Sequence, residues 1–144
     1  MNSRQRFEQI ANYFETLTPQ SVSELTAFYS ATARFKDPFN DVTGVPAIET
    51  IFAHMFASLT QPRFVITGQV VDGDQAFLTW EFRFRFKRFD TQTEQVVLGT
   101  SHLVLDADQR ISLHRDYWDA AEELYEKLPW VGALMRWLKK QANS

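Results

Sequence analysis

Two side chains near the end of the chain could exchange a proton. His114 and Asp116 are separated by one residue in the segment HRDYWD, and in a β-strand such residues share one face. An imidazole and a carboxylate at this spacing can fix each other's ionisation and share a proton, which suits acid/base chemistry. Polarity alone would bury the opposite face, which carries Ile111 and Leu113, and leave the pair in water. Trp118 shares the face of the pair and needs a place to be buried, which favours an inward orientation.

A third acidic residue, Asp37, directly precedes Pro38 at the end of a predicted strand. An Asp at such a position usually belongs to a turn, in which its carboxylate accepts hydrogen bonds from nearby backbone N–H groups. The residue types alone leave open whether this carboxylate also takes part in chemistry.

Other kinds of chemistry find little support in the sequence. The chain has no Cys, which excludes disulfides, thiolate nucleophiles and Cys-ligated metal sites. It also has no glycine-rich nucleotide-binding motif. His102 alternates with Ser101 along its strand and points to the opposite face, and the histidines and acidic residues lack the spacing of common metal sites. We therefore expect no metal and no other cofactor.

Size and composition indicate one folded domain over residues 1–144. Hydrophobic residues make up 44% of the chain and aromatic residues 15%, which is too apolar for a disordered chain. The net charge of −3 gives no basic field that would attract nucleic acid. The N-terminus lacks the pattern of a signal peptide, and no segment approaches the roughly 18 apolar residues of a membrane span. We therefore expect a cytoplasmic protein.

Periodicity places the elements that would position these groups. Apolar residues recur at helical spacing in three N-terminal segments, at about 4–17, 21–29 and 46–59. Residues 78–87 alternate between apolar and polar, which predicts a long half-buried strand. Further strands are expected at about 31–37, 63–71, 95–105 and 110–118, and a helical tail at 120–144.

These elements predict an α+β fold in which three N-terminal helices pack on one face of a strongly curved antiparallel sheet. A sheet that curls around its helices encloses a pocket, and a small ligand would bind there. Aromatic side chains are expected to line this pocket: Phe35, Phe39, Trp80 and Phe82.

The order of the elements, the segment FKDPF before the third helix and HRDYWD on the last strand together resemble the NTF2-like superfamily. The resemblance is to its SnoaL-like and ketosteroid-isomerase-like branch, covers roughly residues 5–119 and implies a cone-shaped fold. Members include isomerases, polyketide cyclases, epoxide hydrolases, dehydratases and proteins without catalytic activity, so the fold alone does not decide the function.

The resemblance also implies roles for single residues. Asp37 falls on the general base of the isomerase's Asp-Pro motif, and a partly desolvated carboxylate is a stronger proton acceptor. Tyr13 lies 24 residues earlier and falls on the tyrosine of the oxyanion hole, which donates a hydrogen bond to a developing enolate. Ser101 stands where the isomerase has a protonated aspartic acid, which is a departure from the family pattern.

On the last strand, the register that the resemblance implies turns His114 and Asp116 toward the pocket, with Trp118 among the pocket aromatics. Two function classes stay open. The first is an enzyme of isomerase, cyclase or hydrolase type that acts on a small apolar substrate. Its base would be Asp37 or Asp116, and its hydrogen-bond donor would be Tyr13 or His114. The second is a carrier that binds such a ligand without catalysis.

The resemblance further implies a homodimer formed through the outer face of the sheet, where Arg83, Arg85 and Lys87 alternate with the buried aromatics. We expect this basic face to be solvated or covered by the second subunit. Association with a membrane is not expected, although the C-terminal segment is amphipathic.

Overall fold

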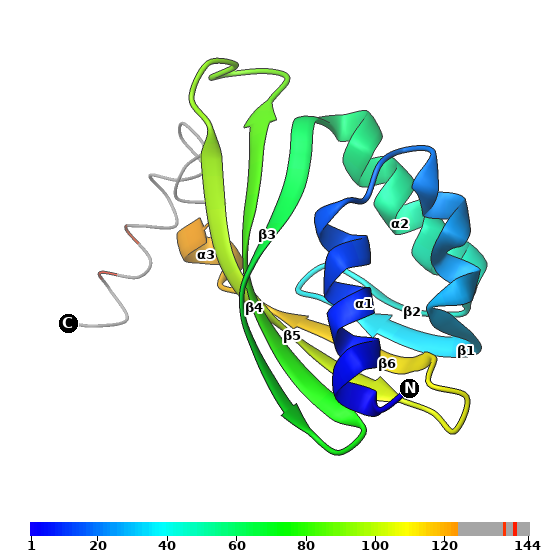
Figure 1. Cartoon of the computed structure of the whole chain (residues 1–144). Coiled ribbons are helices and arrows are strands. Elements are labelled where there is room, and N and C mark those ends of the chain that lie inside the picture. The colour runs from blue at the N-terminus through cyan, green and yellow to red at the C-terminus, as the bar shows by residue number, and fades with distance from the viewer. Residues whose placement is uncertain (124–136, 138–139, 141–144) are drawn as a thin grey trace.

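A six-stranded sheet curves around the helical segments of the N-terminal half, which lie on its concave side (Figure 1). The computed structural model describes residues 1–123 together with residues 137 and 140. Its elements are, in chain order, α1 (Ser3–Glu15), the 3-10 helix η1 (Ser21–Ala27), β1 (Tyr29–Lys36), β2 (Asp41–Thr43), α2 (Val45–Ser58), β3 (Leu59–Asp72), β4 (Gln75–Phe86), β5 (Gln95–Leu105), β6 (Ile111–Tyr117) and α3 (Ala120–Glu123). Beyond α3, the helical tail predicted over 120–144 lies outside the described residues. None of the helices in the described part of the chain is long and apolar enough to cross a membrane.

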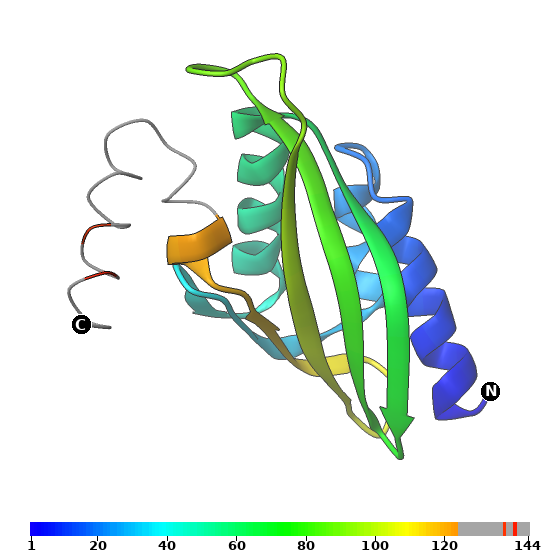
Figure 2. The same ribbon diagram turned by 90° about the vertical axis from the view of Figure 1, so that its left-hand side faces the viewer.

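The strands follow the order β2-β1-β6-β5-β4-β3 across the sheet, which stands in front of α1 and α2 in Figure 2. All neighbours pair antiparallel except β1 and β6, which run parallel, so the prediction of a wholly antiparallel sheet is wrong at this junction. A parallel pair needs a long connection, and here the connection contains α2 and the strands from β2 to β5. As a consequence, β1 and β6 end side by side at the same edge of the sheet.

Both long helices begin where local chemistry provides for their first N–H groups. The Asn2 side chain accepts a hydrogen bond from the Gln5 backbone and the Gln5 side chain accepts one from the Asn2 backbone, which is a capping box at the start of α1. α2 carries Pro46 in its first turn, where a backbone N–H would have no partner in the helix. The second helix is shorter than predicted, because Tyr29 already begins β1 and pairs with Ile111 of β6.

The strong alternation of β4 is confirmed. Its buried residues are all even-numbered and face the helices: Ala76, Leu78, Trp80 and Phe84. β5 has the predicted bounds, whereas β3 begins at Leu59, directly after α2 and earlier than predicted. Gly99 of β5 lies under the indole of Trp80, and a Cβ at this position would lie 2.2 Å from a ring carbon. Only glycine therefore lets the indole extend across β5.

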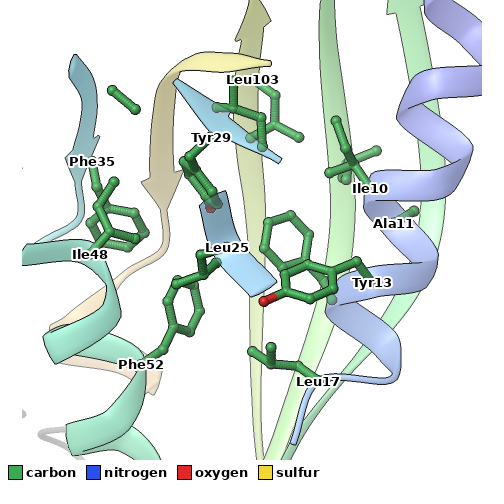
Figure 3. Packing of buried hydrophobic residues seen from close by; sticks show 14 of the residues in the cluster. Ile10, Ala11, Tyr13, Leu17, Leu25, Tyr29, Phe35, Ile48, Phe52 and Leu103 are labelled. Atoms are coloured by element: carbon green, nitrogen blue, oxygen red, sulfur yellow. The ribbon is translucent and has the colours of Figure 1, made fainter. Parts of the chain in front are cut away.

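The main core lies between α1, η1, α2 and the concave face of the sheet (Figure 3). Its largest fully buried side chains come from all of these elements: Phe7, Ile10, Leu25, Tyr29, Ile48, Leu78, Leu103 and Ile111. Each large apolar side chain that is fully buried stabilises the fold by roughly 1.5–3 kcal/mol. A second, smaller cluster of Trp80, Phe84 and Val97 lies on β4 and β5 and faces a cavity.

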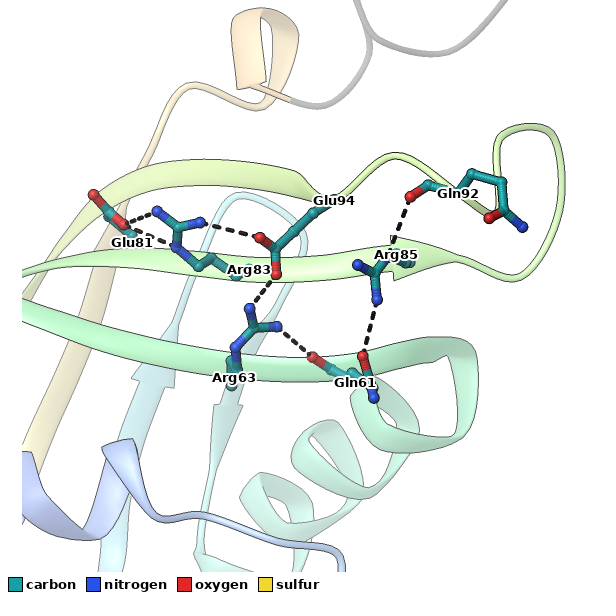
Figure 4. Close-up of polar contacts among 7 residues, drawn as sticks. All are labelled: Gln61, Arg63, Glu81, Arg83, Arg85, Gln92 and Glu94. Carbon is teal, nitrogen blue, oxygen red and sulfur yellow. Dashed lines mark hydrogen bonds and ion pairs between the residues drawn. The ribbon is translucent and has the colours of Figure 1, made fainter.

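The convex face of the sheet carries a network of paired charges (Figure 4). Arg83 donates to the carboxylates of Glu81 and Glu94, and Arg63 pairs with Glu94. Arg85 donates to one side-chain and one backbone oxygen of neighbouring glutamines. Much of the basic face seen in the sequence is therefore paired within this one chain.

Replacing Glu94 by Gln should make the free energy of unfolding depend less on pH in the acidic range. The hydrogen bond from Arg63 holds the pKa of Glu94 below its ordinary value of 4.5, with a further contribution from Arg83. The ion pairs therefore stabilise the folded state above the ordinary pKa, and this stabilisation is lost as the pH falls through the lower, folded pKa. Denaturant unfolding at pH 7 and at about pH 3 should show a smaller loss of stability in the variant than in the wild type. An equal loss in both proteins would contradict this role of Glu94.

Candidate functional site

A cavity of about 370 Å³ lies between α2 and the concave face of the sheet, within the range of roughly 300–1,000 Å³ typical of ligand pockets. Of the fourteen described residues that line it, twelve are apolar: Phe35, Ile51, Phe52, Met55, Leu59, Phe64, Trp80, Phe82, Phe84, Phe86, Val97 and Trp118. The other two belong to Asp37 and Asp116. The site is thus an apolar space with two carboxylates in its wall.

The parallel pairing of β1 and β6 brings these two carboxylates together. Lys36 pairs with Arg115 in this ladder; Asp116 is the next residue of β6, and Asp37 directly follows the last residue of β1. Neighbouring strands lie about 4.8 Å apart, so the two acidic residues occupy adjacent backbone positions at one end of the cavity. Nothing in the local sequence around either residue indicates this neighbourhood, because it depends on a contact between distant strands.

A chain of hydrogen bonds runs through the protein interior to Asp116. The hydroxyl of Tyr29 lies 2.5 Å from Nδ1 of His114, and Nε2 of His114 lies 2.6 Å from Oδ1 of Asp116. Ser101 donates its hydroxyl proton to the same Oδ1, and Nε1–H of Trp80 donates to Ser101 over 2.9 Å. His114 is only 3% exposed, so the structure places the His–Asp pair on the inner face of β6.

The protons of this chain can be assigned from Tyr29. Complete burial, reinforced by the negative charge of Asp116, raises the pKa of Tyr29 well above its ordinary value, so the phenol keeps its proton. We infer that its O–H donates to Nδ1 of His114, since the phenol has this one proton to donate and Nδ1 lies within hydrogen-bond distance. The remaining ring nitrogen, Nε2, carries the imidazole proton and donates it to Asp116. Asp116 is thereby held as an acceptor at Oδ1.

The second carboxylate oxygen of Asp116 has a different environment. Both hydrogen bonds to Asp116 from described residues end on Oδ1. In the described part of the chain, no buried side-chain nitrogen or oxygen atom is left without a hydrogen-bond partner. Oδ2 therefore reaches the cavity surface, where it can accept a proton or a hydrogen bond from a ligand.

Asp37 both makes a turn and lines the cavity. Its Oδ1 accepts hydrogen bonds from the backbone N–H groups of Phe39 and Asn40, over 2.8 and 2.7 Å. The side-chain amide of Asn40 donates to both carboxylate oxygens of Asp37. The carboxylate is held in place by four hydrogen bonds, which leaves it less free than Asp116 to take a proton.

The other predicted pocket residues divide into three groups. Phe35, Trp80, Phe82 and Trp118 line the cavity. Phe39 is 51% exposed and lies at the rim, where its ring packs edge-on against Trp118. Ser101 borders a second cavity of about 20 Å³ beside Asp116, and its only hydroxyl proton is donated to that carboxylate. It therefore positions Asp116, and in this geometry its hydroxyl proton is already engaged within the protein.

The expected place of Tyr13 in the pocket is wrong. Its ring packs in the main core near Leu17 and stacks on Phe28, and its hydroxyl donates to the Ser21 carbonyl oxygen over 2.7 Å (Figure 3). The flank of α1 on which it lies faces η1, whereas the cavity lies against α2. The tyrosine that reaches the acid/base pair is Tyr29, which sequence reasoning placed on a helix. Only its pairing with β6 reveals its role.

Replacing Tyr29 by Phe should cost about 1–3 kcal/mol of stability, because Nδ1 of the buried His114 loses its donor. Tyr13→Phe is the matched control, since it removes one hydroxyl from another buried tyrosine and leaves only the Ser21 carbonyl oxygen without that donor. We expect a loss of about 0.5–1.5 kcal/mol in the control. Denaturant unfolding of both variants measures the difference, and a larger loss in Tyr13→Phe would contradict the proposed proton arrangement.

No group of three metal-ligating side chains lies close together within the described residues. His102 lies on the convex face of the sheet, where its ring stacks on Phe77 and binds the Gln75 side chain. It is therefore remote from the pair formed by His114 and Asp116.

Comparison with known proteins places this geometry in a family. A family model for SnoaL-like domains matches residues 10–114, which is most of the chain. No curated protein sequence matches the chain.

Solved structures share its fold at low sequence identity. One is a protein of ketosteroid isomerase-like fold from Catenulispora acidiphila in complex with trimethylamine (19% identity, TM-score 0.66, covering 79% of this chain and 85% of that one). Another is a candidate SnoaL-like polyketide cyclase from Shewanella putrefaciens (18% identity, TM-score 0.68, covering 83% of this chain and 96% of that one). A third is an epoxide hydrolase from M. tuberculosis (16% identity, TM-score 0.65, covering 84% of this chain and 85% of that one). The matched sequence covers most of the chain, and the curved sheet agrees with the fold of these structures: this chain belongs to the SnoaL-like domain family.

Proposed function

We propose that this chain is a cytoplasmic enzyme that moves protons on a small, largely apolar substrate held in the cavity, without a cofactor. The reaction would be of the isomerase, cyclase or hydrolase type. Structural neighbours that carry a cyclase or an epoxide hydrolase name support this class of chemistry, although their identity to this chain is below 20%. The absence of Cys suits a reducing compartment.

The observation that carries the proposal is the asymmetric environment of Asp116. Oδ1 receives hydrogen bonds from His114 and Ser101, which fix the carboxylate in one orientation. Oδ2 faces the cavity and is free to take a proton from a bound substrate. The proton would then be returned from Oδ2 to another atom of the same substrate, so that Asp116 acts first as base and then as acid.

A carrier is the alternative that uses the same cavity. A carrier needs apolar walls, but it has no use for a buried chain of oriented polar groups. Burying such groups is costly unless every one of them is paired, and here the chain of Tyr29, His114 and Asp116 is paired throughout its buried part. This favours the enzyme.

The test is a general probe of proton abstraction, nitrobenzisoxazole. A base removes the proton from its ring carbon, the N–O bond breaks, and a coloured cyanophenolate is released. We expect saturable turnover at a rate at least about 100-fold above that of an equal concentration of acetate. Binding of the probe without acceleration would favour the carrier and overturn the proposed function.

We also propose that two copies associate through the convex face of the sheet. Exposed apolar side chains gather there on neighbouring strands: Val70, Phe77, Leu98 and Tyr117. An isologous contact would cover the same patch on both copies. Sedimentation at micromolar concentration should show a dimer, and Leu98→Lys should shift it to a monomer of unchanged thermal stability. A monomeric wild type would contradict the proposal.

A further inference from the structure

We propose that the cavity is built for an organic cation, namely a protonated amine or a quaternary ammonium with apolar substituents. This inference rests on the proposed function and names its substrate class. It depends on three properties of the cavity wall: its charge, its aromatic rings and its shortage of hydrogen-bond donors.

The charge of the wall is negative and lacks a matching cation. Among the described residues that line the cavity, Asp37 and Asp116 are the ionisable side chains, and none of these residues is Lys or Arg. The neighbouring cations are engaged elsewhere: Lys36 lies 3.9 Å from Asp41, and the guanidinium of Arg115 lies over the ring of Tyr117. His114 is only 3% exposed, and its Nε2 is already held by Oδ1 of Asp116 over 2.6 Å. A cationic ligand would supply the missing positive charge.

The aromatic side chains of the cavity wall also favour a cationic ligand. Among the described residues, eight aromatic side chains line the cavity, including Trp80 and Trp118. Neighbouring rings meet at interplanar angles between 27° and 85°, so that their faces point in several directions. A cation within about 6 Å of a ring centroid is attracted to the ring face, and the attraction reaches about 2 kcal/mol or more where water is excluded.

The wall also offers acceptors with almost no donors. Oδ2 of Asp116 is open to the cavity, whereas the hydroxyl of Ser101 and the indole N–H of Trp80 are already donated within the protein. Among the described lining side chains, the indole N–H of Trp118 is the donor that no hydrogen bond engages. A substrate whose carbonyl or alkoxide oxygen needs hydrogen bonds would find few hydrogen-bond donors here. An ammonium group brings its own positive charge, and a protonated amine also brings its own donors.

The two carboxylates can then divide the work. Asp37 is held by four hydrogen bonds and serves as a fixed negative anchor for the cation. Asp116 keeps a free oxygen at the adjacent strand position and acts on the bond next to the charged group. Because the two residues directly follow the last pair of the β1–β6 ladder and both line the cavity, one small molecule can reach both.

The experiment compares choline with its uncharged carbon isostere, dimethylbutanol, by isothermal titration calorimetry on the full chain. The two molecules have the same shape, and the uncharged one is the more hydrophobic. We expect choline to bind at least about tenfold more tightly. Asp37→Asn should reduce this preference to about threefold or less, since an amide keeps the turn but removes the charge. Asp108→Asn, an exposed Asp in the β5–β6 turn, should leave the preference unchanged.

Each result decides the inference. Equal or tighter binding of dimethylbutanol would overturn it, and so would binding of neither compound. A preference for choline that survives in both Asp37→Asn and Asp116→Asn would overturn it as well, since the charge of the wall would then have no part in recognition. The proposed function is tested separately, because nitrobenzisoxazole is neutral and its turnover requires a base but no cation site. Competitive inhibition of that turnover by choline would support both.

Discussion

Asp116→Asn is expected to slow the turnover of nitrobenzisoxazole by a factor of about 10²–10⁴ while the protein keeps its fold. The amide oxygen can still accept the hydrogen bonds from Ser101 and His114 that now end on Oδ1. Its NH₂ group then takes the place of Oδ2, and this group cannot accept a proton. The substitution therefore removes the base and little else.

The measurement is kcat/KM for the probe, together with thermal unfolding to show that the variant is folded. Asp108→Asn is the matched control and should behave as the wild type, because the exposed side chain of Asp108 lies in the turn between β5 and β6. Asp37→Asn should lower kcat/KM far less than Asp116→Asn, since an Asn can keep the turn and Oδ2 of Asp116 remains free. The opposite ranking of the two variants would identify Asp37 as the base and contradict our assignment.

The elements with strong local periodicity could be predicted from the sequence. β4 alternates between apolar and polar residues over most of its length, and α1 and α2 repeat their apolar residues at helical spacing, so their faces follow from the chain alone. The boundaries near Tyr29 and Leu59 could not be predicted in this way. Tyr29 begins its strand one residue after η1, and Leu59 begins its strand directly after α2. What makes both of them strand residues is pairing with a distant partner.

The candidate site was predictable only in part, for the same reason. The spacing of His114 and Asp116 indicates that they share a face, but polarity alone would turn that face toward water. The structure turns it inward, because the hydroxyl of Tyr29 and the other donors of the interior satisfy the pair. Tyr13 was wrongly expected in the pocket because its position relative to Asp37 in the sequence says nothing of which neighbour its flank of α1 faces.

His114→Ala is expected to lower the free energy of unfolding by about 3–5 kcal/mol, the largest loss of stability that we predict for a polar residue of this chain. The imidazole is almost completely buried and packs against the rings of Phe14, Tyr29 and Phe35. Its removal leaves a cavity among these rings and takes the hydrogen-bond partner from the buried hydroxyl of Tyr29. Asp116 loses one of its two donors at the same time.

His102→Ala is the control that separates this effect from the loss of any strand histidine. His102 also lies on a strand of the same sheet, stacks on an aromatic ring and makes one side-chain hydrogen bond, but it faces outward. We expect it to cost less than about 1 kcal/mol, because water can replace its partner.

A second variant, His114→Leu, fills most of the space and so isolates the lost hydrogen bonds, which should still cost about 2–4 kcal/mol. Adding Tyr29→Phe to His114→Leu removes the hydroxyl that was left without a partner. The double variant should therefore be no less stable than His114→Leu alone, since replacing both partners of a buried hydrogen bond costs less than orphaning one. Denaturant unfolding of the four proteins measures this coupling. Strictly additive losses of stability would mean that Tyr29 and His114 do not act as a pair. This result would contradict the arrangement of protons from Tyr29 through His114 to Asp116, on which the assignment of Oδ2 as the base depends.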